Sequence, residues 1–255
     1  MDKPKTLLMT GAHPDDETFG VGGTLAHYAA AAVKVYYVCG TRGEVGEVTP
    51  EAMKGYSSIA DLRTHELQCA AEVLGLADVI YLGYRDSGMA GTADNKHSQA
   101  LAAAPVEEVA DRVVSIIRRL QPQVIITSDP VGGYHHPDHI AIHNATVKAF
   151  HAANDAAQYP AAGPPFQPQK LYFHVFPHRW LKVMVKIQTL LGRDPHRFGR
   201  NKAAACHASQ LFGGSPRGGI MGLLNRLFGQ KDSFMRAYPP VTRRRRERDL
   251  FEGVS

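Results

Sequence analysis

The sequence has little cysteine and no long apolar run. Its three cysteines, Cys39, Cys69 and Cys206, are an odd number in 255 residues, and no two of them form a CxxC pair. This spacing favours neither a disulfide framework nor a thiolate zinc site, so we expect three buried thiols. No apolar run reaches the roughly 18 residues that span a bilayer, and the first residues lack a signal peptide's apolar core. We therefore expect a cytoplasmic protein without a transmembrane segment.

Acidic side chains are scarce in the last third of the chain. Residues 179–255 contain 16 Lys and Arg against five Asp and Glu, whereas residues 1–178 contain 13 and 19. Residues 178–193 have the pattern of a basic amphipathic helix, which most often packs on its own core; a membrane surface, a lid or a subunit contact are alternatives. The RRRR run at 243–246 is typical of a solvated surface. Neither segment carries a nucleic-acid-binding motif, so we expect no nucleic acid partner and leave a homo-oligomer open.

Strand-like and helix-like segments alternate through the rest of the chain. Short β-branched and apolar runs predict strands at 6–12, 33–41, 78–84, 123–129 and 170–176. Periodic apolar faces and capping residues predict helices at 18–32, 61–76, 105–120 and 137–153. This order predicts an α/β fold, with a single Rossmann-like open, mostly parallel sheet and helices on both faces. The active site of such a fold lies at the carboxyl ends of the strands.

Charged side chains crowd the turn after the first predicted strand. The stretch AHPDDE places His13, Asp15 and Asp16 where a dinucleotide-binding fold would carry GxGxxG, which argues against a pyrophosphate ligand. Adjacent carboxylates repel each other unless a cation or hydrogen bonds hold them. These residues therefore predict a metal site at the carboxyl end of the strand.

A second polar cluster follows the fourth predicted strand and begins a helix. Its titratable members are His135, His136, Asp138, His139 and His143. His13 and Asp16 together with one of these histidines would form a His₂Asp site with open positions, as catalytic zinc requires. The spacing leaves open which histidine is the ligand. The stretch HIAIH lacks the glutamate of a metalloprotease HExxH, so we do not favour that class.

The two clusters, AHPDDE and HPDH, resemble the zinc-dependent N-acetylglucosaminyl deacetylases of the phosphatidylinositol-glycan class L (PIG-L) and LmbE-like family. The resemblance extends through TRGEVGE, RTHEL, LGYRDSGM and CHASQ, the last at residues 206–210. YRDSGM and GGYHHPDH are most similar to the mycothiol-pathway branch, which includes a deacetylase and a conjugate amidase. The resemblance implies a deacetylase domain over 1–210, with 211–255 as a basic C-terminal extension packed on or flanking it.

The resemblance also implies the site residues. His13, Asp16 and His139 would bind one Zn²⁺ per subunit, with Fe²⁺ as an alternative in the cell. Asp15 would be the general base, and His136 would stabilise the oxyanion and help to protonate the leaving amine, with Asp138 adjusting His136. The substrate would contact four further residues, which are Arg63, Asp86, Glu47 and Tyr134.

These residues predict a zinc-dependent hydrolase that removes the acetyl group from an N-acetylglucosamine-type amino sugar or glycoconjugate. The alternative within the family is an amidase that cleaves a larger conjugate, such as a thiol S-conjugate. A mononuclear iron oxygenase also uses two histidines and a carboxylate, but Asp15 beside the ligands and the α/β pattern argue against it. A protein that only bound a metal or a sugar would need neither the base Asp15 nor the oxyanion donor His136.

Overall fold

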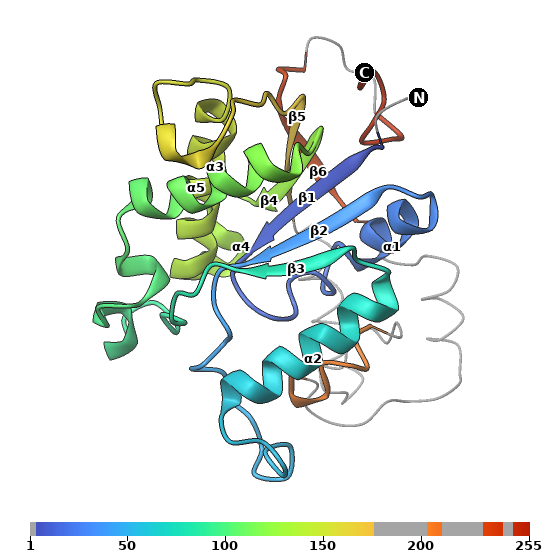
Figure 1. The fold of residues 1–255 in the computed structure, drawn as a ribbon. Helices are drawn as coiled ribbons and strands as arrows, with labels where there is room; N and C mark the ends of the chain where they lie inside the picture. The colour runs from blue at the N-terminus through green and yellow to red at the C-terminus, as the bar shows by residue number, and fades with distance from the viewer. Residues whose placement is uncertain (1–3, 176–202, 211–231, 242–246) are drawn as a thin grey trace, which may run out of the picture.

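The structure is a computed structural model that describes residues 4–175, 203–210, 232–241 and 247–255 (Figure 1). The basic segments at 178–193 and 243–246 lie outside the described residues. No helix within the described ranges is both long enough and apolar enough to cross a bilayer.

The described residues form one six-stranded sheet with helices between its strands. The strands are β1 (Thr6–Gly11), β2 (Lys34–Cys39), β3 (Asp78–Tyr81), β4 (Val124–Ser128), β5 (Lys170–His174) and β6 (Phe234–Tyr238). The helices are α1 (Gly22–Ala30), α2 (Ile59–Leu74), α3 (Val106–Leu120), the short α4 (Gly132–His135) and α5 (Pro137–Ala152). Single 3₁₀ turns lie at Ala93–Lys96, Leu101–Ala103, Pro160–Ala162 and Ala208–Gln210.

The strand order is β3-β2-β1-β4-β5-β6, and neighbouring strands are parallel except for β5 and β6. The predicted fold class is therefore confirmed. The antiparallel strand β6 was not expected, and it comes from the segment that the sequence suggested as an extension of the domain. The chain reverses its direction across the sheet between β1 and β4, so the loops that follow these two strands diverge and leave a crevice between them.

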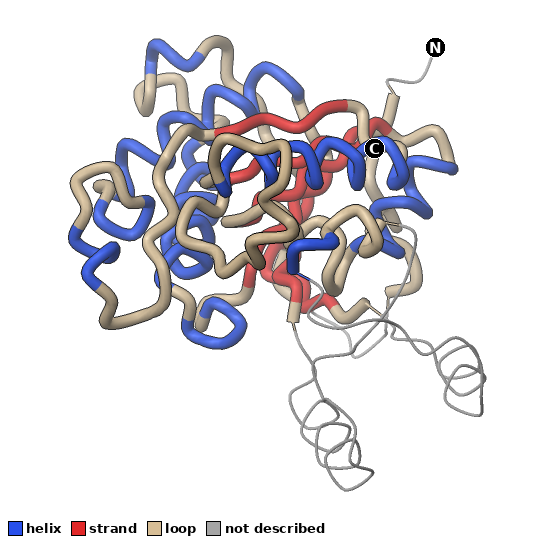
Figure 2. Tube along the Cα trace, turned by 90° about the horizontal axis from the view of Figure 1, so that it is seen from below, coloured by secondary structure: helices blue, strands red, loops and turns tan. Residues whose placement is uncertain are grey.

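Side chains on alternate positions of the central strands enter two separate cores. On β1, Leu8 packs among the apolar residues of α3 and α5, whereas Leu7 and Met9 pack with those of α1. Helices α3 and α5 therefore cover one face of the sheet, and α1 and α2 cover the other (Figures 1 and 2). The strands β1 and β4 are buried on both faces, which explains why their sequences are nearly continuous apolar runs.

Local signals set the helix boundaries, with one informative exception. Helix α2 begins where the Ser58 hydroxyl accepts a hydrogen bond from the Asp61 amide, and it ends at Gly75, whose φ is 73°. Helix α1 begins at Gly22, not at the predicted residue 18. The residues before it form turns in which the Thr18 and Phe19 amides donate to the Asp15 carbonyl. These turns place the charged side chains of AHPDDE instead of extending the helix.

The prediction of three buried thiols is wrong for two of the cysteines. Cys69, on α2, forms a disulfide with Cys206, and only Cys39 is a free, buried thiol. The two partners are 137 residues apart in sequence, so no local spacing indicates the bond. They meet because residues 203–210 pack against α2, where the Glu66 carboxylate accepts hydrogen bonds from the amide and hydroxyl of Ser209.

Candidate metal and catalytic site

The first half of the site is the turn that follows β1. The Asp16 carboxylate folds back over the end of the strand and accepts hydrogen bonds from the amides of Ala12 (2.8 Å) and His13 (3.1 Å). The Tyr37 hydroxyl donates to the His13 carbonyl over 2.7 Å. A side chain at Gly11 would clash with this hydroxyl, because a Cβ there would overlap the Tyr37 Oη. The glycine thus lets a buried tyrosine fix the backbone of the turn.

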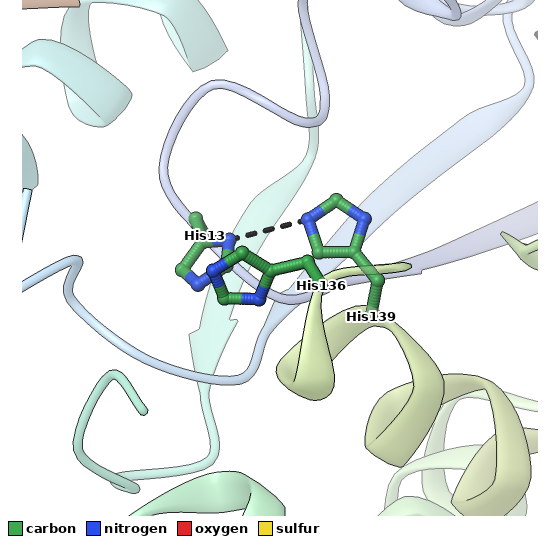
Figure 3. A group of neighbouring side chains, drawn as sticks. All are labelled: His13, His136 and His139. Atoms are coloured by element: carbon green, nitrogen blue, oxygen red, sulfur yellow. Dashed lines mark hydrogen bonds between the residues drawn. The ribbon is translucent and has the colours of Figure 1, made fainter. Parts of the chain in front are cut away.

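The second half of the site is the start of α5, which follows β4. His136 is the N-cap residue, and its Nδ1 accepts a hydrogen bond from the Asp138 amide over 3.2 Å. Pro137 occupies the first turn, where its missing amide proton costs nothing. His139 lies in the first turn of the helix, and its ring faces His13 (Figure 3). Since β1 and β4 are adjacent and parallel, both clusters reach the same edge of the sheet.

The two halves bring metal-ligating atoms together. The His13 Nδ1 lies 3.3 Å from the His139 Nε2 (Figure 3). The same His139 nitrogen lies 3.5 Å from the Asp16 Oδ1. In tetrahedral zinc sites with bonds of about 2.0–2.1 Å, neighbouring ligand atoms are about 3.4 Å apart. Each of these two pairs therefore has the spacing of neighbouring ligands on one metal ion, and the three residues His13, Asp16 and His139 form the candidate ligand group.

His136 also lies beside this group. The ligand atoms of His13, His136 and His139 all fall within 4.8 Å of one another, and the same is true of His13, Asp86, His136 and Asp138. The other two histidines of the second cluster have different surroundings. His143 Nδ1 is 2.7 Å from the Ser128 carbonyl, and His135 is exposed with a φ of 67°.

The Asp138 carboxylate lies near both His136 and His13. Its Oδ2 lies 3.2 Å from the His13 Nε2, while its carboxylate also accepts hydrogen bonds from the amide and hydroxyl of Ser87. His136 accepts a hydrogen bond from the backbone amide of Asp138, and the Asp138 carboxylate lies within 4.8 Å of its ligand atom. A carboxylate on the outer nitrogen of His13 leaves Nδ1 free to face the metal position. Ser87 was missed by sequence reasoning, since a serine in a turn gives no signal of this contact.

Asp15 lies next to the ligand group in a conformation that is rare for a residue with a side chain. Its φ is 120°, and its carboxylate lies 3.1 Å from the Arg63 guanidinium, which also donates to the Pro14 carbonyl. Burial raises the pKa of Asp15 to about 7, although Arg63 opposes this shift. The carboxyl group can therefore exchange a proton near neutral pH.

The four expected substrate contacts fall into two groups. Arg63 and Asp86 are buried, with Arg63 against Asp15 and the Asp86 Oδ1 3.5 Å from the His13 Nε2. Tyr134 is 58% exposed, and its ring centre lies 5.6 Å from that of His139, so it borders the ligand group. Glu47 is exposed on the loop after β2.

The electrostatics of the site favour a positive charge at its centre. Burial alone would lower the pKa of His13, but hydrogen bonds to Asp138 and Asp86 and the charge of Asp16 raise it to about 10. Burial would raise the pKa of Asp16, yet the neighbouring His139 and His13 lower it. Burial and the charge of His13 lower the pKa of His136 to about 4, so its ring is neutral. The carboxylates that surround the buried His13 ring thus provide the negative charge that a bound cation needs.

The fold and the site define a Rossmann-like α/β protein with a candidate His/Asp metal centre at the carboxyl edge of its sheet. A family model described as PIG-L, GlcNAc-PI de-N-acetylase, matches residues 8–150. The matched region is more than half of the chain and contains both polar clusters. The chain belongs to the PIG-L family, as its motifs predicted.

Two relatives from actinobacteria are similar to most of the chain. The proteins from Kineococcus radiotolerans and Streptomyces avermitilis are 42% and 41% identical over 195 and 182 residues. Both are named 1D-myo-inositol 2-acetamido-2-deoxy-alpha-D-glucopyranoside deacetylase. The alignments cover 70% and 68% of this chain but only 54% and 62% of the relatives, so the chain spans less than two thirds of their length.

Solved structures show the same fold in proteins of different function. A conserved protein from Thermus thermophilus is 31% identical with a TM-score of 0.51, covering 68% of this chain and 66% of its own. An N,N'-diacetylchitobiose deacetylase from Pyrococcus horikoshii is 22% identical with a TM-score of 0.57, covering 81% and 70%. A 4-carboxy-2-hydroxymuconate hydratase from Pseudomonas putida is 18% identical with a TM-score of 0.56, covering 94% and 98%. Because a hydratase shares the fold, the activity has to be argued from the site.

Proposed function

We propose that the protein is a zinc-dependent hydrolase that removes the acetyl group from an N-acetylglucosamine unit, with an inositol-linked glycoside as the first candidate substrate. The observation that carries this proposal is that the His139 ring lies at ligand spacing from both His13 and Asp16, while the carboxyl group of the neighbouring Asp15 is held by Arg63. The names of the actinobacterial relatives support the choice of the inositol glycoside.

His13, Asp16 and His139 would hold the metal. When bound, zinc supplies a positive charge that polarises an amide carbonyl and acidifies water. The same donor set also suits Fe²⁺. Two histidines and one carboxylate leave coordination positions open, as a catalytic site requires and a structural zinc site does not.

Asp15 would act as the general base that takes a proton from the attacking water. A base is most effective when its pKa is near the working pH, and burial brings the pKa of this carboxyl group to about 7. Its hydrogen bond from Arg63 fixes one carboxylate oxygen and leaves the other for the water.

His136 would donate a hydrogen bond to the oxygen that becomes negative during attack. Its Nδ1 accepts the Asp138 amide, so a neutral ring carries its proton on Nε2 and presents a donor. Such a donor contributes about 3–4 kcal/mol to the stabilisation of an oxyanion in other hydrolases. As the C–N bond breaks, the proton that Asp15 took from the water would pass to the leaving amine with the help of His136, after which acetate and the free amino sugar leave. Arg63, Asp86, Glu47 and Tyr134 are our candidates for contacts with the sugar.

Acetate release tests the proposal directly. We would assay the zinc-loaded protein on N-acetylglucosamine, its β-linked disaccharide and its inositol glycoside, together with Asp15→Asn. General-base removal should lower kcat by about 10²–10⁴-fold while the bound zinc stays at one per chain. Asp111→Asn, an exposed Asp on α3, is the matched control and should keep full activity.

Each other outcome has a clear meaning. Full activity of Asp15→Asn would remove Asp15 from the base role. A wild-type protein that binds zinc but releases no acetate from any substrate would contradict the deacetylase proposal. Release of an amine from a thiol S-conjugate in the same protein would then identify the amidase of the same family.

A further inference from the structure

The backbone of Asp15 is hydrogen-bonded to a buried pair of side chains, Glu17 and His207. Glu17 and His207 are both fully buried, and the His207 Nε2 lies 2.7 Å from the Glu17 Oε1. The second oxygen of Glu17, Oε2, accepts the backbone amide of Asp15 over 2.9 Å. The Thr18 hydroxyl donates to Oε1 as well. One carboxylate therefore connects the backbone of Asp15 to a residue 190 positions later in the chain than Glu17.

The backbone of Asp15 needs such support. A φ of 120° is unfavourable for a residue with a Cβ, and residues in this region persist only where the surroundings hold them. The Arg63 guanidinium donates a hydrogen bond to the Asp15 carboxylate, and the Glu17 carboxylate accepts one from the Asp15 amide. If the amide were released, the turn would relax toward ordinary φ values and the carboxylate would swing out of its position beside the ligand group.

His207 is itself firmly placed. The disulfide between Cys69 and Cys206 ties the preceding residue to α2, and Ser209 donates its amide and hydroxyl to Glu66 of the same helix. Helix α2 also carries Arg63. The helix and the segment 203–210 thus approach Asp15 as one anchored unit, with Arg63 on its carboxylate and His207 acting through Glu17.

We propose that Glu17 and His207 are positioning residues of the hydrolytic site, which hold the backbone of Asp15 so that its carboxylate faces the attacking water. This inference rests on the proposed role of Asp15. Both residues act through the amide of Asp15, which donates to Glu17, and Glu17 in turn contacts His207. A pair that only stabilised the fold would instead affect activity and stability together.

The test compares two substitutions of the same histidine. His207→Gln keeps an N–H donor toward Glu17, whereas His207→Leu has similar bulk and no donor. We expect His207→Leu to lower kcat by about 10–100-fold, as losses of outer partners do in metal sites, with KM for the inositol glycoside and zinc content unchanged. His207→Gln should recover most of the lost kcat. His65→Leu, the same substitution at an exposed histidine of α2, is the matched control and should keep kcat within about twofold.

A second readout does not depend on activity. The Asp15 amide proton is bonded to Glu17, so its exchange with solvent, followed by NMR, should be slow in the wild type and in His207→Gln and fast in His207→Leu. A wild type with a protected Asp15 amide but no acetate release would contradict the proposed function while leaving the support of Asp15 intact. Unchanged kcat and unchanged amide protection in His207→Leu would overturn the positioning role, as would an equal loss of kcat in His65→Leu.

Discussion

At the level of single residues, the site depends on which nitrogen of His13 faces the other ligands. The Asp138 carboxylate accepts from Nε2, and Ser87 fixes that carboxylate with its amide and hydroxyl. The other ring nitrogen of His13, Nδ1, then faces His139. Outer hydrogen bonds of this kind set the tautomer of a ligating histidine and increase its basicity.

Removing the charge of Asp138 should therefore weaken metal binding. In Asp138→Asn, the amide can present its N–H₂ group to His13 and favour the wrong tautomer. We expect the zinc dissociation constant, measured by competition with a chromophoric chelator at pH 7, to rise by about 10–100-fold. Asp111→Asn serves again as the control. An unchanged affinity would show that Ser87 and Asp86 suffice to orient His13.

Among the helices and strands, α5 joins the site to the core through one side of its first two turns. His139 faces the ligand group, and one turn later His143 lies against the Phe173 ring of β5, with its Nδ1 on the Ser128 carbonyl at the end of β4. Burial lowers the pKa of His143, although the carbonyl opposes this shift. The folded protein therefore prefers the neutral form of this histidine.

This preference predicts a pH-dependent stability. A histidine whose pKa is lower in the folded than in the unfolded state binds fewer protons when folded, so its contribution is complete above the unfolded value of about 6.5 and decreases below it. The raised pKa values of His13 and Asp15 act in the opposite direction, so the prediction concerns the difference between two proteins. We expect the free energy of unfolding in urea of the zinc-free wild type, relative to that of zinc-free His143→Asn, to decrease from pH 7.5 to pH 5.5, because the other groups titrate equally in both proteins. Identical slopes in the two proteins would exclude His143 as a source of the acid sensitivity.

Across the entire domain, distant parts of the chain complete the fold. Residues 203–210 pack on α2 through the disulfide and Glu66, and β6 adds the last strand of the sheet. The final residues also return to the core, where Phe251 packs in the same cluster as Leu7 of β1. The C-terminal part of the chain is thus integrated into the fold at each described segment.

The disulfide should contribute measurably to the stability of this arrangement. It closes a loop of 137 residues, for which the chain-entropy model gives about 4–5 kcal/mol as an upper bound. We expect the oxidised wild type to unfold at a higher urea concentration than the Cys69→Ser, Cys206→Ser double variant, and a thiol reductant to lower the midpoint of the wild type alone. Thiol titration in denaturant should find one free thiol before reduction and three after it. Three free thiols in the protein purified without reductant would contradict the bond.

The amino-acid sequence was enough to predict the class of fold, the family and the edge of the sheet where the polar clusters meet. Strand and helix periodicity are local properties, and AHPDDE and HPDH are contiguous motifs, so both can be read without knowing which distant residues touch. The antiparallel β6, the Cys69–Cys206 bond and the contact of Asp138 with His13 emerged only from the folded chain. The support of Asp15 by Glu17 and His207 is of the same kind, because burial and long-range packing bring together residues that sequence spacing keeps apart.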